Sequence, residues 1–245
     1  MLLLVSVASA DEAATAVAGG ADIIDAKDPA AGPLGAVRLD VLSQIVSTAG
    51  AARLVTAALG DAADHAAIER AAFGAASAGA GFVKIGFAGV AGKAQAASLL
   101  AAAGHGAASG GDGRCGVVAV AYADADAVAS LNPDELLDAA AAAGSAGVLL
   151  DTAHKNGPGL RGLIGDEAVS AWVARAHRHG LMVALAGRLQ LDDLDFVREA
   201  GADIAGVRGA ACDGGRAGRI SVEKVRALAR LALRHRTSPR EIARR

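Results

Sequence analysis

The sequence has 245 residues, of which 53% are hydrophobic and only 2% aromatic, and its formal net charge is −2. This length allows one large domain with a real core, and the near-neutral charge excludes the basic field typical of proteins that bind nucleic acid or anionic membranes. No apolar run reaches the roughly 20 residues of a membrane span, the apolar start is too short for a signal peptide, and two cysteines cannot form a disulfide framework. We therefore expect a soluble, cytoplasmic, single-domain protein.

Short apolar runs alternate with longer helical runs along the whole chain. The expected strands are Met1–Ser6, Asp22–Lys27, Arg53–Ala58, Phe82–Gly86, Gly116–Tyr122, Gly147–Thr152, Leu181–Ala186 and Asp203–Arg208. The expected helices are Asp11–Ala18, Arg38–Thr48, Ala62–Ala78, Ala91–Ala103, Pro133–Ala143, Asp166–His179, Leu191–Ala200 and Ser221–Leu233. Apolar strands that are each followed by a helix predict a parallel sheet covered by helices.

Eight such units in a chain of this length match a TIM (β/α)8 barrel. A doubly wound open sheet is the rival fold, but the first strand–helix turn lacks the glycine-rich dinucleotide fingerprint. Ala-Gly turns recur before strands, as in Ala78–Gly81 and Ala200–Asp203, which supports a quasi-repeating barrel with glycine at the helix ends. We expect the barrel to span residues 1–233, Gly104–Arg114 to be a flexible surface linker, and the basic tail 234–245 to be frayed.

The lysines are the most informative residues of the sequence. Of its 24 basic residues only five are lysines, so a lysine retained in this arginine-rich chain is a candidate for chemistry that arginine cannot perform. An amine can lose its proton and attack a carbonyl, whereas a guanidinium effectively cannot.

Three of the lysines lie at expected strand ends, where TIM barrels place catalytic residues. Asp25 and Lys27 are two apart in one strand and therefore share a face, Lys84 lies within an apolar strand, and Asp151 ends a strand with Lys155 in the following loop. One interpretation is a structural ion network in which Lys27 pairs with Asp25 or Asp151. The other is a Schiff-base lysine whose pKa is lowered by burial and by a second ammonium group.

A second group of residues is typical of a phosphate site. Gly187 ends the seventh expected strand, and Arg208, Gly209 and Ala210 follow the eighth. Barrels often bind phosphate on these two loops, where glycine allows close backbone approach and arginine can contact the anion. The alternative is an ordinary glycine turn beside a surface arginine.

Other polar residues carry weaker signals. Tyr122 and Asp124 end the fifth expected strand, so either could line the mouth of the barrel. His177 and His179 lack matching cysteine or carboxylate spacing, so we expect no metal site.

Five stretches of the chain, in order and with matched spacing, resemble the (5-formylfuran-3-yl)methyl phosphate synthase family. They are Ala21–Pro29, Phe82–Gly86, Leu149–Lys155, His179–Gly187 and Asp203–Cys212. The resemblance extends from Met1 to about Leu233. It implies a TIM barrel that condenses two molecules of glyceraldehyde 3-phosphate into 4-(hydroxymethyl)-2-furancarboxaldehyde phosphate, with loss of one phosphate and several waters. The product carries the furan of the methanofuran-type C1 carriers.

The resemblance also implies roles for individual residues. The family's Schiff-base lysine falls on Lys27, its proton-transferring lysine on Lys84, and two further active-site residues on Asp151 and Lys155. It implies no metal and no organic cofactor. The expected partner is a small-molecule triose phosphate, with no nucleic acid and no membrane, and the sequence leaves a homo-oligomer open.

Two alternatives remain at this point. One is another class I Schiff-base aldolase or triose-phosphate lyase that uses the same lysine on the same barrel. The other is a barrel that binds a sugar phosphate without catalysis, which predicts no trapped imine.

Overall fold

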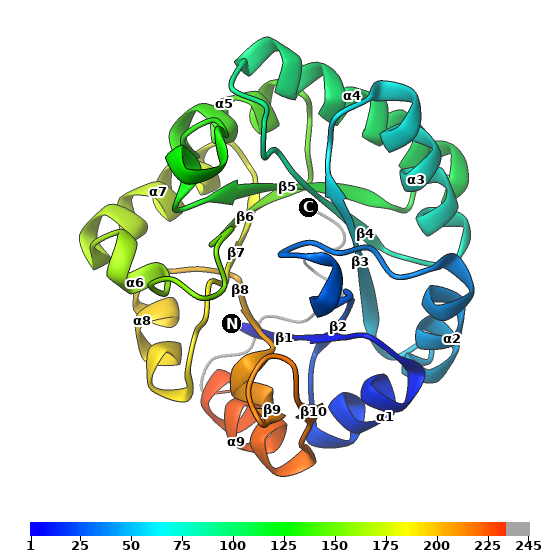
Figure 1. Cartoon of the computed structure of the whole chain (residues 1–245), viewed down its shortest axis with the longest axis vertical. Helices are drawn as coiled ribbons and strands as arrows, with labels where there is room; N and C mark the ends of the chain where they lie inside the picture. The colour runs from blue at the N-terminus through cyan, green and yellow to red at the C-terminus, as the bar shows by residue number, and fades with distance from the viewer. Residues whose placement is uncertain (234–245) are drawn as a thin grey trace.

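A computed structural model describes residues 1–233, in which eight parallel strands close into a barrel (Figure 1). Each strand pairs in parallel with the next, and β1 pairs with β8 to close the ring. The strands are β1 (Leu2–Val7), β2 (Ile23–Ala26), β3 (Leu54–Asp61), β4 (Phe82–Gly86), β5 (Gly116–Tyr122), β6 (Gly147–Asp151), β7 (Met182–Leu185) and β8 (Ile204–Val207). The predicted TIM barrel is confirmed, and the predicted tail 234–245 lies outside the described residues.

The helices surround the barrel as an outer ring (Figure 1). The α-helices are α1 (Ala10–Gly19), α2 (Leu39–Ala49), α3 (His65–Ser77), α4 (Lys93–Gly110), α5 (Pro133–Ala142), α6 (Leu160–Leu163), α7 (Asp166–Arg178), α8 (Leu194–Glu199) and α9 (Val222–Ala232). Short 3₁₀ turns are η1 (Pro29–Ala31), η2 (Ala125–Val128), η3 (Leu191–Asp193) and η4 (Gly209–Ala211). Within residues 1–233, no helix is both long enough and apolar enough to cross a bilayer.

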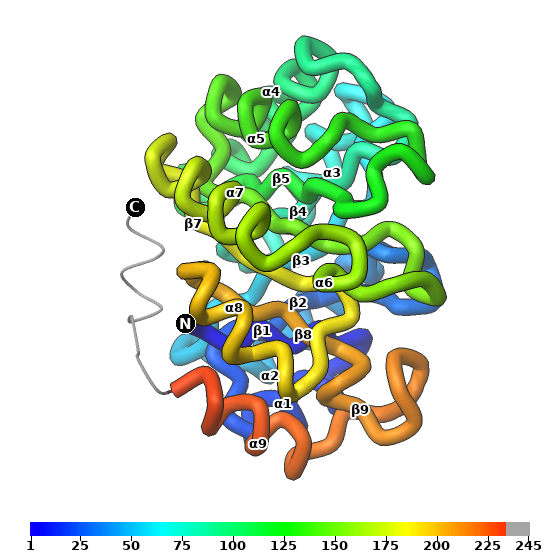
Figure 2. The backbone as a smooth tube through the Cα atoms, turned by 90° about the vertical axis from the view of Figure 1, so that its left-hand side faces the viewer, coloured from blue at the N-terminus to red at the C-terminus, as the bar shows by residue number. Residues whose placement is uncertain are grey.

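A small hairpin, β9 (Cys212–Asp213) with β10 (Arg219–Ile220), follows the eighth strand and was not predicted. It projects from the end of the barrel opposite the N-terminus (Figure 2). The chain therefore carries an extra element over the carboxyl ends of the strands, where barrel enzymes place their active sites.

The strands have two apolar faces because successive side chains point to opposite sides of the barrel wall. One face packs with the helices in a continuous outer core, and the other forms a smaller inner core that includes Leu2, Val120 and Tyr122. At the helix ends, Gly79 and Gly201 have φ of 98° and 82°, left-handed values that favour glycine. The predicted glycine turns before strands are thus confirmed.

The predicted linker Gly104–Arg114 is wrong over most of its length, because α4 continues to Gly110. The glycines there permit close packing rather than flexibility. A Cβ atom at Gly106 would overlap the backbone of Glu69 in α3, and one at Gly110 would overlap the backbone of Phe73. A glycine-rich composition can mark either a loop or a close helix–helix contact, and only the tertiary structure separates the two.

This packing predicts opposite effects for two glycines of α4. Gly106→Ala should lower the free energy of unfolding by about 1–3 kcal/mol, since an added methyl group must push the helices apart. Gly104→Ala is the matched control: no atom lies within 4 Å of its Cβ position, so the better helix former should raise stability by about 0.5–1 kcal/mol. Urea denaturation of both variants measures the difference, and equal effects would contradict the packing explanation.

Candidate active site

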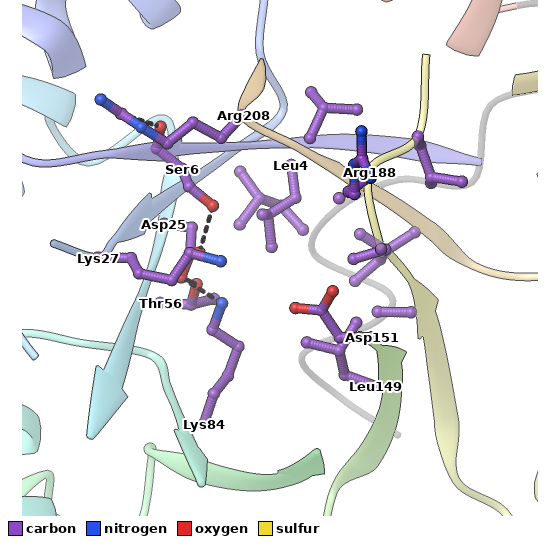
Figure 3. A pocket seen from close by; sticks show the side chains of 18 of the residues that line it. Leu4, Ser6, Asp25, Lys27, Thr56, Lys84, Leu149, Asp151, Arg188 and Arg208 are labelled. Atoms are coloured by element: carbon purple, nitrogen blue, oxygen red, sulfur yellow. Dashed lines mark hydrogen bonds and ion pairs between the residues drawn. The ribbon is translucent and has the colours of Figure 1, made fainter. Parts of the chain in front are cut away.

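The carboxyl ends of the strands surround a cavity of about 330 Å³ (Figure 3). Its floor is apolar and includes Leu54, Phe82, Val118 and Ile204. The charged side chains on its wall are Asp25, Lys27, Lys84, Asp151, Lys155, Arg188, Arg208 and Arg216. The five residues predicted to be catalytic therefore line one cavity, brought there by β2, β4, β6 and the loop after β6.

A fully buried carboxylate, Asp25 on β2, organises one side of the cavity. Lys84 on β4 places its Nζ 2.5 Å from Asp25 Oδ1. The hydroxyl of Thr56 on β3 donates to the same oxygen at 2.7 Å, and the hydroxyl of Ser6 on β1 donates to Oδ2 at 2.8 Å. Burial alone raises the pKa of Asp25, but the charges of Lys84 and Lys27 outweigh it, so the pKa lies below its usual value. Asp25 is a stable anion, and Lys84 is its cationic partner.

The Lys27 amine lies one residue beyond the end of β2 and is held differently. Its side chain is also buried, with 8% of the residue exposed, yet within residues 1–233 no hydrogen bond or ion pair holds its Nζ. Burial, and after it the charge of Lys84, lowers the pKa of Lys27 to about 8. At this pKa about a tenth of the amines are neutral at pH 7, far more than for an ordinary lysine. The amine is therefore available as a nucleophile.

A second carboxylate, Asp151 at the end of β6, stands across the cavity (Figure 3). Its Oδ1 accepts from Lys155 Nζ at 2.6 Å and from the Thr152 amide at 2.7 Å. Its Oδ2 is buried and accepts no hydrogen bond from the described residues. Burial raises the pKa of Asp151, but the charges of Lys155 and Lys27 bring it below its usual value. Asp151 thus presents an ionised oxygen with an open acceptor position.

These ion pairs differ from the network considered in the sequence analysis, in which Lys27 pairs with Asp25 or Asp151. The pairs are Lys84 with Asp25 and Lys155 with Asp151, whereas Lys27 is left without a direct carboxylate partner. Of the three lysines in the cavity, Lys27 has the arrangement that a Schiff-base lysine requires: buried, unpaired and beside a second ammonium group.

The predicted phosphate corner is only partly as expected. Gly187 and Gly209 line the cavity, but Ala210 does not. Arg208 is in the wall, yet its guanidinium points away from Lys27 and Asp151 (Figure 3). Its five N–H groups donate to Arg216 O, Ser6 O, both carboxylate oxygens of Glu12, and Gly218 O. Because every donor is used, Arg208 has none left for an anion. The predicted phosphate contact of its side chain is therefore wrong: Arg208 instead braces the backbone around it.

Several polar side chains on the cavity wall were not predicted from the sequence, and four of them bear on the site. Ser6 and Thr56 are the hydroxyls that flank Asp25, and they occupy strand positions in register with it. Arg188 directly follows Gly187, is exposed, and has a φ of 60°, a strained value for a residue other than glycine. Arg216 lies between glycines in the β9–β10 hairpin. Arg188 could have been predicted from the sequence, because it directly follows Gly187 of the predicted phosphate corner.

Two weaker candidates lie outside the cavity wall. Tyr122 is fully buried inside the barrel, where its hydroxyl donates to Asp61 Oδ1 at 2.7 Å. Asp124 accepts from the amides of Ala153 and His154 and so shapes the loop after β6. Within residues 1–233, no group of three or more histidine, cysteine or acidic side chains is arranged to hold a metal ion.

Comparison with known proteins agrees with the resemblance seen in the sequence. A family model described as 4-HFC-P synthase matches residues 3–229. Proteins named (5-formylfuran-3-yl)methyl phosphate synthase from Methanopyrus kandleri and Methanocaldococcus jannaschii are 41% and 39% identical to this chain. The alignments cover 87% of this chain and 90% of the first relative, and 94% of this chain and 99% of the second.

Solved structures with low sequence identity share the fold. KGPDC from Streptococcus mutans superposes with a TM-score of 0.66 at 16% identity, covering 95% of this chain and 97% of that one. 3-Hexulose-6-phosphate synthase gives 0.62 at 22% identity, covering 93% and 99%. These likenesses support the barrel architecture.

The charges around Lys27 predict pKa shifts of opposite sign in two variants. Lys84→Gln removes a cation that lowers the pKa of Lys27, so half-maximal reactivity of the Lys27 amine should move above pH 8. Asp151→Asn removes an anion that raises this pKa, so the midpoint should move below pH 8. Reductive methylation with formaldehyde across the pH range, followed by peptide mass mapping, measures both midpoints. The exposed Lys93 is the internal control, and shifts of Lys27 in the same direction would contradict the arrangement.

Proposed function

The chain belongs to the 4-HFC-P synthase family, and we propose that it condenses two molecules of glyceraldehyde 3-phosphate into 4-(hydroxymethyl)-2-furancarboxaldehyde phosphate through a Schiff base on Lys27. The balanced reaction releases one phosphate and two waters, which makes the protein a carbon–oxygen lyase. The product would supply the furan of methanofuran-type C1 carriers. The observation that carries this proposal is the buried, unpaired amine of Lys27 between two ion pairs.

Lys27 is the proposed nucleophile. Its neutral amine attacks the carbonyl of one triose phosphate, and loss of water leaves an iminium ion that serves as an electron sink. Removal of a proton from the neighbouring carbon then gives an enamine, a carbon nucleophile that attacks the aldehyde of the second triose. Hydrolysis of the carbon–nitrogen bond by one water then releases the bound carbon skeleton and restores the Lys27 amine. The apolar floor of the cavity favours the uncharged amine that starts this sequence.

Lys84 is the proposed proton carrier. Its ammonium is held on Asp25, so it enters the cycle as an acid that can protonate the oxygen lost when the imine forms. Ser6 and Thr56 hold Asp25 in place from both sides, and Asp25 thereby fixes where the Lys84 proton is delivered.

Asp151 and Lys155 are proposed to serve the eliminations. Asp151 Oδ2 accepts no hydrogen bond from the described residues and can take up a proton from carbon or from a hydroxyl. Lys155, bound to the other oxygen of Asp151, can donate a proton to a leaving hydroxide or phosphate. The pair places a base and an acid beside each other, which dehydration requires.

The corner formed by Gly187 and Gly209 is the proposed site for one substrate phosphate. Both glycines allow close backbone approach, as in other barrels that bind phosphate after their seventh and eighth strands. Arg188 supplies the cation there in place of Arg208, because within residues 1–233 its guanidinium makes no hydrogen bond or ion pair. Its strained backbone is consistent with a side chain that is held in place for binding.

The covalent step is tested by two lysine variants. Lys27→Arg should be nearly inactive although it keeps the charge, because arginine stays protonated near pH 7 and cannot attack a carbonyl. Lys84→Arg should lose most of its activity but still form the imine on Lys27, since the nucleophile and the proton carrier are different residues.

Incubation with glyceraldehyde 3-phosphate and borohydride, then peptide mapping, locates the imine. A parallel incubation without borohydride identifies the product by mass and by the near-ultraviolet absorption of a furan. A simple aldol product, which lacks this absorption, would favour an ordinary class I aldolase. An active Lys27→Arg enzyme, or an adduct on Lys84 or Lys155, would refute the assignment.

The phosphate corner is tested by Arg188→Gln. The glyceraldehyde 3-phosphate concentration for half-maximal furan formation should rise at least about tenfold in this variant. The reason is that a hydrogen bond to a charged group contributes more binding free energy than one between neutral groups. Arg178→Gln makes the same change of charge at an exposed position of α7, outside the cavity, and should behave as wild type. Equal saturation curves for the two variants would remove Arg188 from the site.

A further inference from the structure

We propose that Arg216 forms a second anion subsite, which binds the phosphate of the other triose phosphate. The proposal rests on the proposed function for the identity of that ligand. The subsite itself is inferred from which cations of the cavity have no carboxylate partner and where they lie.

The first observation is that Arg216 is delivered to the cavity by a braced element. The β9–β10 hairpin carries Gly215 and Arg216 onto the cavity wall. Arg208 donates from Nε to Arg216 O at 2.9 Å, and the same guanidinium is paired with Glu12, on α1, at 2.8 Å. The brace therefore fixes the backbone of Arg216 over the mouth of the barrel.

The second observation is that the guanidinium of Arg216 is held only by neutral groups. It donates from Nη1 to Pro29 O and from Nη2 to Gly32 O, each at 2.9 Å, in the loop that follows Lys27. An arginine has five N–H groups, so three remain free for a ligand. Within residues 1–233 no carboxylate is paired with Arg216, and main-chain carbonyls orient its charge without neutralising it.

The third observation concerns the other cations of the cavity. Lys84 is paired with Asp25, Lys155 with Asp151, and Arg208 with Glu12. In the described part of the chain, the cavity cations without a carboxylate partner are Lys27, Arg188 and Arg216. Lys27 acts as a neutral nucleophile in the proposed reaction, which leaves two arginines.

Two substrate molecules of this kind bring two phosphate groups into one cavity. Two phosphate dianions repel each other at short range, so each needs a cation of its own. One phosphate is retained in the product and the other is expelled, which also requires that the two be held apart. Arg188 at the Gly187 corner and Arg216 on the hairpin supply two separate subsites for these two anions.

Calorimetric titration with inorganic phosphate tests the subsite without reference to the reaction. Wild type should bind two phosphate ions per chain, whereas Arg216→Gln should bind one, because glutamine can still donate to a loop carbonyl but carries no charge. Arg219→Gln, an exposed arginine of the same hairpin that lies outside the cavity wall, is the matched control and should bind two. Two sites in Arg216→Gln would overturn the proposal, and so would a single wild-type site that Arg216→Gln retains.

A conservative variant separates charge from hairpin structure. Arg216→Lys keeps the cation but cannot bridge both carbonyls, so it should retain the second site with affinity reduced about tenfold. If Arg216 only closes the hairpin, Arg216→Lys should lose the second site as completely as Arg216→Gln does, and that outcome would also overturn the proposal. Thermal unfolding midpoints of the variants report whether the hairpin has come loose.

Furan formation then distinguishes the failure of this inference from the failure of the proposed function. In Arg216→Gln, the glyceraldehyde 3-phosphate concentration for half-maximal furan formation should rise about tenfold or more. No furan from wild type, together with a phosphate site lost in Arg216→Gln, would refute the proposed function and leave the subsite standing. Normal furan formation with unchanged saturation and unchanged phosphate binding in Arg216→Gln would refute the subsite alone.

Discussion

The ion pair between Asp25 and Lys84 is the interaction on which the rest of the cavity depends. Two buried lysines and a half-buried third in one small space repel one another and resist desolvation, so at least one of them must lose its proton or find a partner. Asp25, fully buried and bound by Ser6 and Thr56, can neutralise only one of them, and geometry assigns it to Lys84. Lys27 is then left without a partner of its own, and burial, followed by the charge of Lys84, lowers its pKa to about 8. The charge held on Lys84 thus adds to burial in lowering the pKa of Lys27.

The alanine-rich composition matters because the proposed reaction needs space inside the barrel. A barrel of eight strands is normally filled by side chains, yet here a cavity of about 330 Å³ extends down to an apolar floor. Small residues on the wall, such as Ala184, Ala186 and Gly206 on or next to β7 and β8, leave this room. The same apolar floor removes water from the amines above it. The packing of the barrel therefore also contributes to the lowered pKa of Lys27.

Much of the fold and of the charged cluster in the cavity could be predicted, because both depend on local patterns. A strand's period places Asp25 and Lys27 on one face, and parallel strands bring their carboxyl ends together, so Lys84 and Asp151 follow. The errors concern choices between partners. Gly106 and Gly110 were predicted to lie in a loop because the α3 residues that they contact are distant in sequence. Arg208 was predicted to bind phosphate because no local pattern showed that its guanidinium would pair with Glu12, nearly two hundred residues away.

The difference between Arg208 and Arg216 shows how partners rather than positions assign function in this cavity. Both arginines lie on the wall, and Arg208 is in the more usual place for a phosphate ligand after β8. Arg208 spends its donors on Glu12 and on carbonyls, which cancels its charge and fixes the hairpin. Arg216 is oriented by that hairpin and meets only carbonyls, which leave its charge intact. The neutralised arginine is thus a structural support for the charged one, and the anion-binding role that the sequence suggested for Arg208 falls in our proposal on Arg216, eight residues along the chain.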